Sequence, residues 1–132
     1  MNTFGAEIFK TTIVSAGIKE SIAKAEGLNT ISVVRKATTR KKIFNGEDIW
    51  AKLIADSDKQ TLVGVQMLGP REVSRIGERV LLMIGEEIPL ARISQYETIF
   101  SPPLSNAYDL ITNEVDILIG ELLKMGKSVK WS

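Results

Sequence analysis

The alternation of side chains in residues 49–56 constrains the fold of this chain more than any other feature. Every second residue of the run is apolar: Ile49, Ala51, Leu53 and Ala55. Because successive side chains of a strand point to opposite faces of a sheet, this period of two predicts a strand whose odd-numbered face lies on the core. The polar run 56–60 that follows predicts a tight turn.

A returning strand and a helix are predicted after that turn. Residues 61–68 carry Val63, Val65 and Met67 on one face. Gly69-Pro70 then ends the strand and starts a helix, because proline is well tolerated at a first helical position. Apolar residues recur in this helix at steps of three and four until Gly85 ends it: Val73, Ile76, Gly77, Val80, Leu81 and Ile84.

The first part of the chain predicts two more strands and a short helix. Residues 9–14 and 30–34 are rich in β-branched side chains, which favours strands. Residues 18–26 predict a helix that Gly27 ends. Asn45-Gly46 predicts a hairpin turn, because both residues tolerate positive φ.

The last part of the chain predicts helices. Pro89 opens a short helical turn, and Ser105 can cap a longer helix. The apolar stripe of that helix comprises Ile111, Val115, Leu118, Leu122 and Met125. Strands followed by helices predict an α+β domain, with an antiparallel sheet and helices packed on one face.

Two absences exclude most kinds of catalytic centre. The chain has no cysteine and no histidine. Without cysteine it has no disulfide, no thiolate nucleophile and no cysteine-based metal site. Without histidine it lacks the usual general base near neutral pH. We therefore expect no catalytic residue and no metal site in this chain.

Composition favours one cytoplasmic domain. The chain has 132 residues, of which 44% are hydrophobic, and a net charge of +1. This length suits a single core. No apolar run is long enough to span a bilayer, and the N-terminus lacks the features of a signal peptide. Trp50 and Trp131 are interpreted as packing residues.

One basic cluster allows two interpretations: Arg35, Lys36, Arg40, Lys41 and Lys42. Such a cluster can contact the phosphates of a cofactor or of nucleic acid. We favour a solvated hairpin arm, because no aromatic residues interleave with the basic ones and the net charge is near zero.

The order of the motifs resembles the C-terminal dimerisation domain of the flavin-dependent pyridine nucleotide-disulfide oxidoreductases. Ala16-Gly17-Ile18, followed by a glutamate-bearing helix, is similar to the opening of that domain. Residues 50–56 and 62–70 are similar to its central hairpin, and residues 71–85 to the next helix.

The resemblance extends over residues 9–122. It implies that residues 1–132 form a single dimerisation domain. That domain is a fragment of a larger flavoprotein or a free-standing relative that lost the catalytic domains.

In this family, the loop before the last helix reaches the flavin site of the partner subunit. The disulfide-reductase branch carries His-Pro there, whereas this chain has Ser101-Pro102. Pro102-Pro103 is similar to the NADH oxidase and coenzyme A disulfide reductase branch, but Phe100 replaces the tyrosine usual in the latter enzymes. An oxidase-like or persulfide-type reductase is thus implied. The candidate partner-site loop comprises Phe100, Ser101, Pro102, Pro103 and Ser105.

The resemblance also implies cofactors and a partner. In the family, FAD and NAD(P)H bind to domains that precede this one, and this chain has no glycine-rich dinucleotide fingerprint. We expect it to bind neither cofactor alone. A homodimer is implied, with candidate interface residues Ile111, Val115, Leu118 and Leu122.

Two other functions remain open at this point. One is a free-standing, non-enzymatic dimeric binding or regulatory module of the same fold. The other, less favoured, is nucleic-acid binding through the basic cluster. We expect no nucleic-acid partner and no membrane partner.

Overall fold

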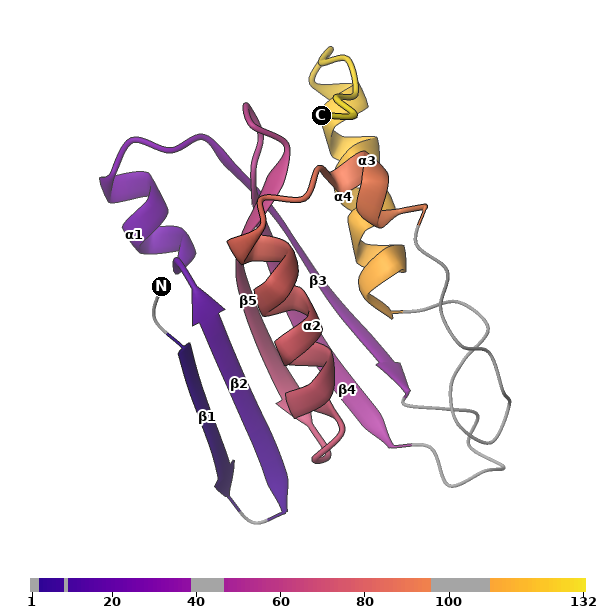
Figure 1. Ribbon diagram of the computed structural model, residues 1–132. Helices are drawn as coiled ribbons and strands as arrows, with labels where there is room; N and C mark the ends of the chain where they lie inside the picture. Colours follow the sequence, from indigo (N-terminus) through magenta and orange to yellow (C-terminus); the bar gives the residue numbers. More distant parts are fainter. Residues whose placement is uncertain (1–2, 9, 39–46, 96–109) are drawn as a thin grey trace.

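Figure 1 shows the computed structural model, which describes residues 3–8, 10–38, 47–95 and 110–132. The elements in these ranges follow one another in the order β1 (Thr3–Ile8), β2 (Thr11–Gly17), α1 (Glu20–Ala25), β3 (Thr30–Thr38), β4 (Asp48–Asp56), β5 (Thr61–Gly69), α2 (Val73–Gly85), α3 (Leu90–Ile93) and α4 (Leu110–Lys124).

The strands form one antiparallel sheet in the order β1-β2-β5-β4-β3. β3 and β4 pair along their whole lengths, from Thr30 opposite Asp56 to Thr38 opposite Asp48. β2 pairs with β1 on one side and with β5 on the other. This sheet, with helices packed against it, confirms the predicted α+β class.

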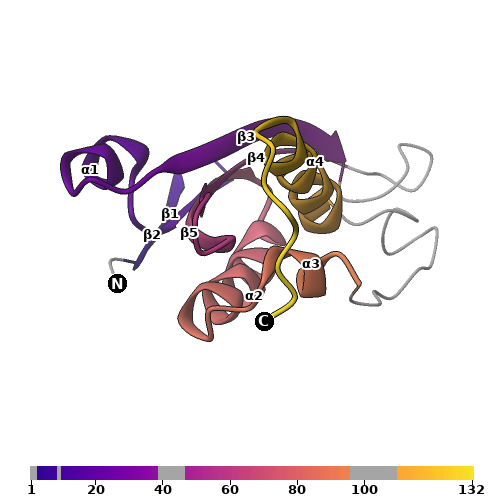
Figure 2. The same ribbon diagram turned by 90° about the horizontal axis from the view of Figure 1, so that it is seen from above.

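Three helices cover one face of the sheet. α2 packs on β2 and β5, while α4 packs on β3 and β4 and contacts α3. The view from above places α2, α3 and α4 on the same side (Figure 2). α1 lies apart from them at the end of the sheet, and only its Ala23 is buried.

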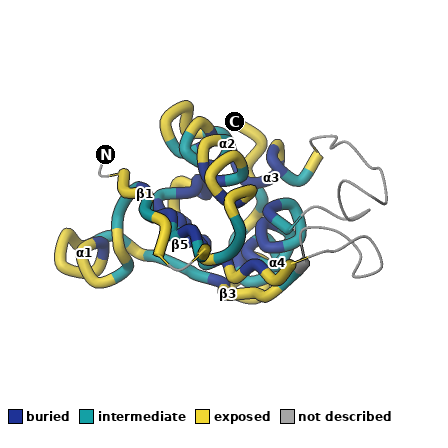
Figure 3. The backbone as a smooth tube through the Cα atoms, turned by 90° about the horizontal axis from the view of Figure 1, so that it is seen from below, coloured by how far each residue is buried: buried dark blue, intermediate teal, exposed yellow. Residues whose placement is uncertain are grey.

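The core lies between the sheet and these three helices. All four odd-numbered residues of the predicted strand are at most 2% exposed: Ile49, Ala51, Leu53 and Ala55. The predicted core face is therefore confirmed, although Ile54 and Asp56 on the other face are also buried, at 1% and 5% exposure. In Figure 3 the inner parts of α2, α3 and α4 are buried (dark blue), whereas α1 is mostly exposed (yellow).

A β-bulge changes the predicted face of β5. The register between β4 and β5 shifts between Ile54 and Ala55, so that Ala55 pairs with Leu62. Leu62 is consequently buried with Val65 and Met67, whereas Val63 is only partly buried. The sequence prediction was wrong for Val63 because a bulge inserts one residue and reverses the alternation beyond it.

The backbones of β2 and β5 approach closely at two glycines. Gly17, with φ of +78°, lies opposite Gly64 in the register. A Cβ on Gly64 would collide with the carbonyl oxygen of Ile18, and one on Gly17 with the carbonyl oxygen of Val63. This approach lets residue 18 cross the end of the sheet and leads the chain into α1.

Several element boundaries differ from the predictions. β1 was not predicted, because the turn to β2 uses Lys10 at a φ of 66° instead of glycine or asparagine. β3 continues to Thr38, past the charged Arg35-Lys36 pair. Met125 was wrongly placed on the core stripe, since it follows the end of α4 and is 51% exposed. Asn45-Gly46 lies outside the described residues.

Candidate functional site

The predicted partner-site loop lies outside the described residues. This applies to all five of its members, namely Phe100, Ser101, Pro102, Pro103 and Ser105. Their role remains a prediction. The described residues present two faces of the sheet assembly, one covered by α2, α3 and α4 and one uncovered.

The four candidate interface residues of α4 form part of the core of the protomer. Ile111, Val115, Leu118 and Leu122 are each 0% exposed. Packing against β3, β4 and α3 accounts for this stripe without a second copy. A dimer contact through α4 remains a prediction, and it would use the outer side of the helix. There, Leu123 is 58% exposed and Ile119, one turn earlier, is partly buried.

Glu114 lies fully buried on the same stripe of α4. Neither carboxylate oxygen has a hydrogen-bond partner within the described part of the chain. Burial raises the pKa of Glu114 to about 8, and the charge of Arg35 on β3 offsets part of that effect. The side chain is therefore mainly protonated at neutral pH. The sequence does carry a signal for this burial. Glu114 comes three residues after Ile111 and four before Leu118, and this spacing places it on the apolar stripe of the helix.

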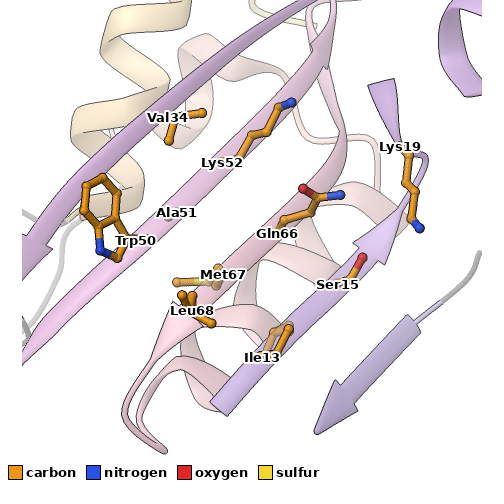
Figure 4. Close-up of a pocket in the computed structure, with 11 residues that line it drawn as sticks. Ile13, Ser15, Lys19, Val34, Trp50, Ala51, Lys52, Gln66, Met67 and Leu68 are labelled. Atoms are coloured by element: carbon orange, nitrogen blue, oxygen red, sulfur yellow. The ribbon is translucent and has the colours of Figure 1, made fainter. Parts of the chain in front are cut away.

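The face of the sheet that α2, α3 and α4 leave uncovered carries an apolar row. Ile13 pairs with Leu68, and Leu68 pairs with Trp50, so the three side chains stand in line across β2, β5 and β4. Figure 4 shows this row, with Val34 of β3 beside it. These residues line a hollow of about 460 Å³. We call this surface, with Phe4 and Ile8 of β1, the open face.

One end of the open face is polar. Glu20 of α1 accepts a hydrogen bond of 2.8 Å from Lys52 Nζ and one of 3.5 Å from Ser32 Oγ. The hydrogen bond from Lys52 and then its charge hold the pKa of Glu20 below its usual value. This ion pair links α1 to β4.

The two tryptophans were wrongly interpreted as packing residues. Trp50 is 48% exposed on the open face, and Trp131 is 58% exposed in the C-terminal tail. Lys36 Nζ lies 5.7 Å from the centre of the Trp50 ring and 3.3 Å from the Asp48 carboxylate. The alternation of β4 places Trp50 opposite the core face, so its exposure follows from the pattern.

The described members of the basic cluster do not form a patch. Arg35 pairs with Ala51 on the helix-covered face of the sheet, whereas Lys36 pairs with Trp50 on the open face. Arg40, Lys41 and Lys42 lie outside the described residues. The two described side chains therefore cannot contact one phosphate group together.

Acidic side chains are the metal ligands that the described ranges could offer, since the chain has no cysteine and no histidine. In these ranges, no three acidic side chains come together in a group that could hold a metal ion. None of the helices placed there has the length and apolar character of a membrane span.

Comparisons with known proteins agree on one kind of domain. The family model described as the pyridine nucleotide-disulphide oxidoreductase dimerisation domain matches residues 5–110. The comparison with curated proteins found no match.

Solved structures share the fold at low sequence identity. An NAD-dependent persulfide reductase from A. fulgidus is 22% identical with a TM-score of 0.85, and the match covers 93% of this chain and 23% of that chain. The water-forming NADH oxidase from Lactobacillus brevis is 19% identical with a TM-score of 0.86, covering 95% of this chain and 28% of that chain.

A third similar structure is the reduced CoADR-RHD of Bacillus anthracis. It is 23% identical with a TM-score of 0.81, and the match covers 93% of this chain and 22% of that chain. This chain therefore spans about a quarter of the length of the similar proteins.

Proposed function

This chain belongs to the pyridine nucleotide-disulphide oxidoreductase dimerisation-domain family, and we propose that it pairs two subunits of an FAD-dependent NAD(P)H oxidoreductase. The enzyme is of the NADH oxidase or disulfide/persulfide reductase type. The observation that carries the proposal is the family match over residues 5–110.

The dimer contact that we propose uses the helical side of the domain. The core stripe of α4 is occupied by its own sheet, so the outer side of that helix is the part left for a second copy. Ile119, which packs partly against the core, and Leu123, which is 58% exposed, are four residues apart and form an apolar line along the edge of this side. A two-fold axis would bring two such lines together.

The catalytic groups of the proposed enzyme lie outside this chain. FAD and NAD(P)H would bind to the remaining portion of a subunit, which makes up about three quarters of the similar proteins. The Pro102-Pro103 loop before α4 would contact the flavin site of the partner subunit. Two consecutive prolines fix φ and give such a loop a rigid shape.

Sedimentation velocity of the 132-residue chain tests the pairing. We expect a dimer, and we expect Leu123→Lys to shift it toward monomer because a charge would enter the apolar line. Val34→Lys is the matched control: Val34 is 56% exposed, close to the 58% of Leu123, but lies on the open face. A strict monomer at high concentration would contradict the proposal, and so would a dimer that only Val34→Lys dissociates.

The natural reading frame around this sequence distinguishes the proposed enzyme from the alternative, a free-standing module. A flavin-binding fingerprint encoded in the same frame or in a neighbouring gene supports the oxidoreductase. A dimer without any such portion supports the free-standing, non-enzymatic binding or regulatory module instead.

A further inference from the structure

A carboxyl group is enclosed between α4 and the sheet. Glu114 is 0% exposed, as are its neighbours on the same stripe of the helix, Ile111, Val115 and Leu118. Neither carboxylate oxygen of Glu114 has a hydrogen-bond partner within the described ranges. An ionised carboxylate buried without partners is far more costly than the neutral acid. The position of α4 on the sheet therefore favours a proton on Glu114.

Little charge faces Glu114 in the described part of the chain. On β3, Arg35 belongs to the row on the helix-covered side, and the rest of that row is apolar: Ile31, Val33 and Ala37. The matching row of β4 carries no charge, and on α3 the charged Arg92 is exposed. On α4 itself, the residues three and four positions from Glu114 are apolar: Leu110, Ile111, Ile117 and Leu118. Arg35 offsets only part of the effect of burial, so an ionised Glu114 is better stabilised in water than beneath α4.

The C-terminal end of α4 is anchored by contacts that follow its last turn. The side chain of Gln60 hydrogen-bonds to the backbone of Ser128 and of Lys130, at 2.8 Å each. Glu114 lies in the first half of α4, and this helix packs on β3, the edge strand of the described sheet. A movement of α4 away from the sheet would therefore pivot at its C-terminal end and uncover Glu114.

We infer that proton binding by Glu114 controls how often the first half of α4 separates from the sheet. The helix lies on the sheet while the acid is neutral, and it separates more often as the acid ionises. This inference rests on the proposed function and adds regulation to it: the outer side of the same helix carries the proposed dimer contact, so release of α4 opposes pairing. Linkage is reciprocal, so pairing in turn keeps the helix on the sheet. Higher pH is thus the condition that favours the monomer.

The direction of the effect follows from the proton affinity of Glu114 in its two positions. The pKa of Glu114 is about 8 beneath α4, against an ordinary value of 4.5 in water. As the pH rises between these values, the separated helix releases the proton to solvent while the packed helix still binds it, so separation becomes more frequent. One titrating group changes the equilibrium by at most about tenfold per pH unit. Above about pH 8 Glu114 is ionised in both positions, and no further change is expected.

Native-state hydrogen exchange measures the separation, with protection factors that are corrected for the direct effect of pH on exchange. In the 132-residue chain, we expect the protection of amides 114–118 to fall by up to about tenfold per unit between about pH 5.5 and 7.5. Amides 80–84 of α2 should stay more protected at each pH, because they exchange when the whole domain opens. Equal protection of both helices at every pH would show that α4 leaves the sheet only on global unfolding, and it would overturn the inference.

Variants assign the effect to Glu114. Glu114→Gln keeps the shape of the side chain but cannot ionise, so the protection of amides 114–118 should no longer depend on pH. Glu114→Leu suits the apolar stripe and should give the same pH independence without a buried polar group. Glu121→Gln is the matched control on the same helix: Glu121 is partly exposed and lies 3.4 Å from Lys124 Nζ, so the pH dependence should stay as in the original chain. An unchanged pH dependence in either Glu114 variant would contradict the inference.

Repeating the exchange at several protein concentrations separates this inference from the proposed pairing. If both hold, the protection of amides 114–118 rises with concentration, because pairing keeps α4 on the sheet. Protection that depends on pH but not on concentration supports the proton control and contradicts pairing through α4. Protection that depends on concentration but not on pH supports the pairing and overturns the inference.

Discussion

Gln60 binds Ser128 through a hydrogen bond of 2.8 Å, in which the side-chain amide nitrogen of Gln60 donates to the Ser128 carbonyl. The amide oxygen of the same side chain accepts a hydrogen bond of 2.8 Å from the backbone N–H of Lys130. Gln60 is 2% exposed and lies in the turn between β4 and β5. The side chain of Gln60 thus holds the C-terminal tail against the turn between β4 and β5.

Replacing Gln60 should release this tail. We expect Gln60→Ala to lower the free energy of unfolding by about 1–3 kcal/mol, since two hydrogen bonds are lost at about 0.5–1.5 kcal/mol each. Urea denaturation measures the loss, and hydrogen exchange of residues 127–132 should become faster. The control is Gln95→Ala, an exposed glutamine whose side chain donates at 3.4 Å to Ser94. Unchanged exchange in the tail would contradict the role of Gln60.

Adding one methyl group at Gly64 should destabilise the domain. The new Cβ of Gly64→Ala would collide with the carbonyl oxygen of Ile18, which is backbone and cannot move without shifting the start of α1. We expect a loss of about 1–3 kcal/mol or more. Gly120→Ala is the control, because its Cβ meets nothing within 4 Å and alanine in a helix gains about 0.5–1 kcal/mol. Urea denaturation should give a lower free energy of unfolding for Gly64→Ala and a higher one for Gly120→Ala.

Glu114 should make stability fall as pH rises. Its pKa is about 8 in the folded chain against 4.5 as the ordinary value, so the folded state binds the proton more tightly than the unfolded state. The stability is fully present below about pH 4.5 and is lost progressively up to about pH 8, at no more than about 1.4 kcal/mol per pH unit. Glu114→Gln should remove this slope, because glutamine stays neutral.

Urea denaturation at several pH values measures the slope. Glu121→Gln on the same helix is the control: Glu121 is partly exposed, and its carboxylate lies 3.4 Å from Lys124 Nζ. A slope between pH 5 and 8 that is equal in the original chain and in Glu114→Gln would show that Glu114 is not the group that titrates.

The Glu20–Lys52 ion pair should make stability fall as the pH is lowered into the acid range, which is the opposite of the effect of Glu114. The pKa of Glu20 is lowered by the hydrogen bond and charge of Lys52. Its contribution is therefore present above the ordinary pKa of about 4.5 and lost as the pH falls through the folded value. Both side chains are about a third exposed, so we expect a small effect. NMR titration of the Glu20 carboxyl group should show its pKa return toward the ordinary value in Lys52→Met.

The sequence predicted the structure correctly where a single physical rule determines the local structure. The alternation from Ile49 to Ala55 correctly predicted the buried face of β4, because the extra residue of the bulge, Val63, lies on β5 and leaves the alternation of β4 intact. The apolar spacing in α2 and α4 correctly predicted most of the covered positions, with Val80 and Leu118 both fully buried, but it missed the buried Met83 and wrongly included Met125. Gly69-Pro70 correctly marked the end of β5, but Pro70 is not the first helical residue, because α2 begins at Val73.

The sequence did not predict features that depend on contacts between two distant parts of the chain. The bulge at Val63 depends on how β5 pairs with β4, and no local pattern encodes it. The stripe of α4 has the spacing of a helix that covers a surface, but spacing does not say whether that surface belongs to its own sheet or to a second copy. Glu114 shows the same limit, because only the packing of α4 on the sheet reveals that its carboxyl group is enclosed.

The strand order has a consequence for how this domain is made. β2 ends at residue 17, but its inner neighbour β5 is complete only at residue 69. On the ribosome, the first hairpin therefore emerges about fifty residues before the strand that will fix it in place. Contacts this distant along the chain close slowly. For that interval the edge of β2 that will pair with β5 is unpaired, and it is open to chaperones or to wrong neighbours.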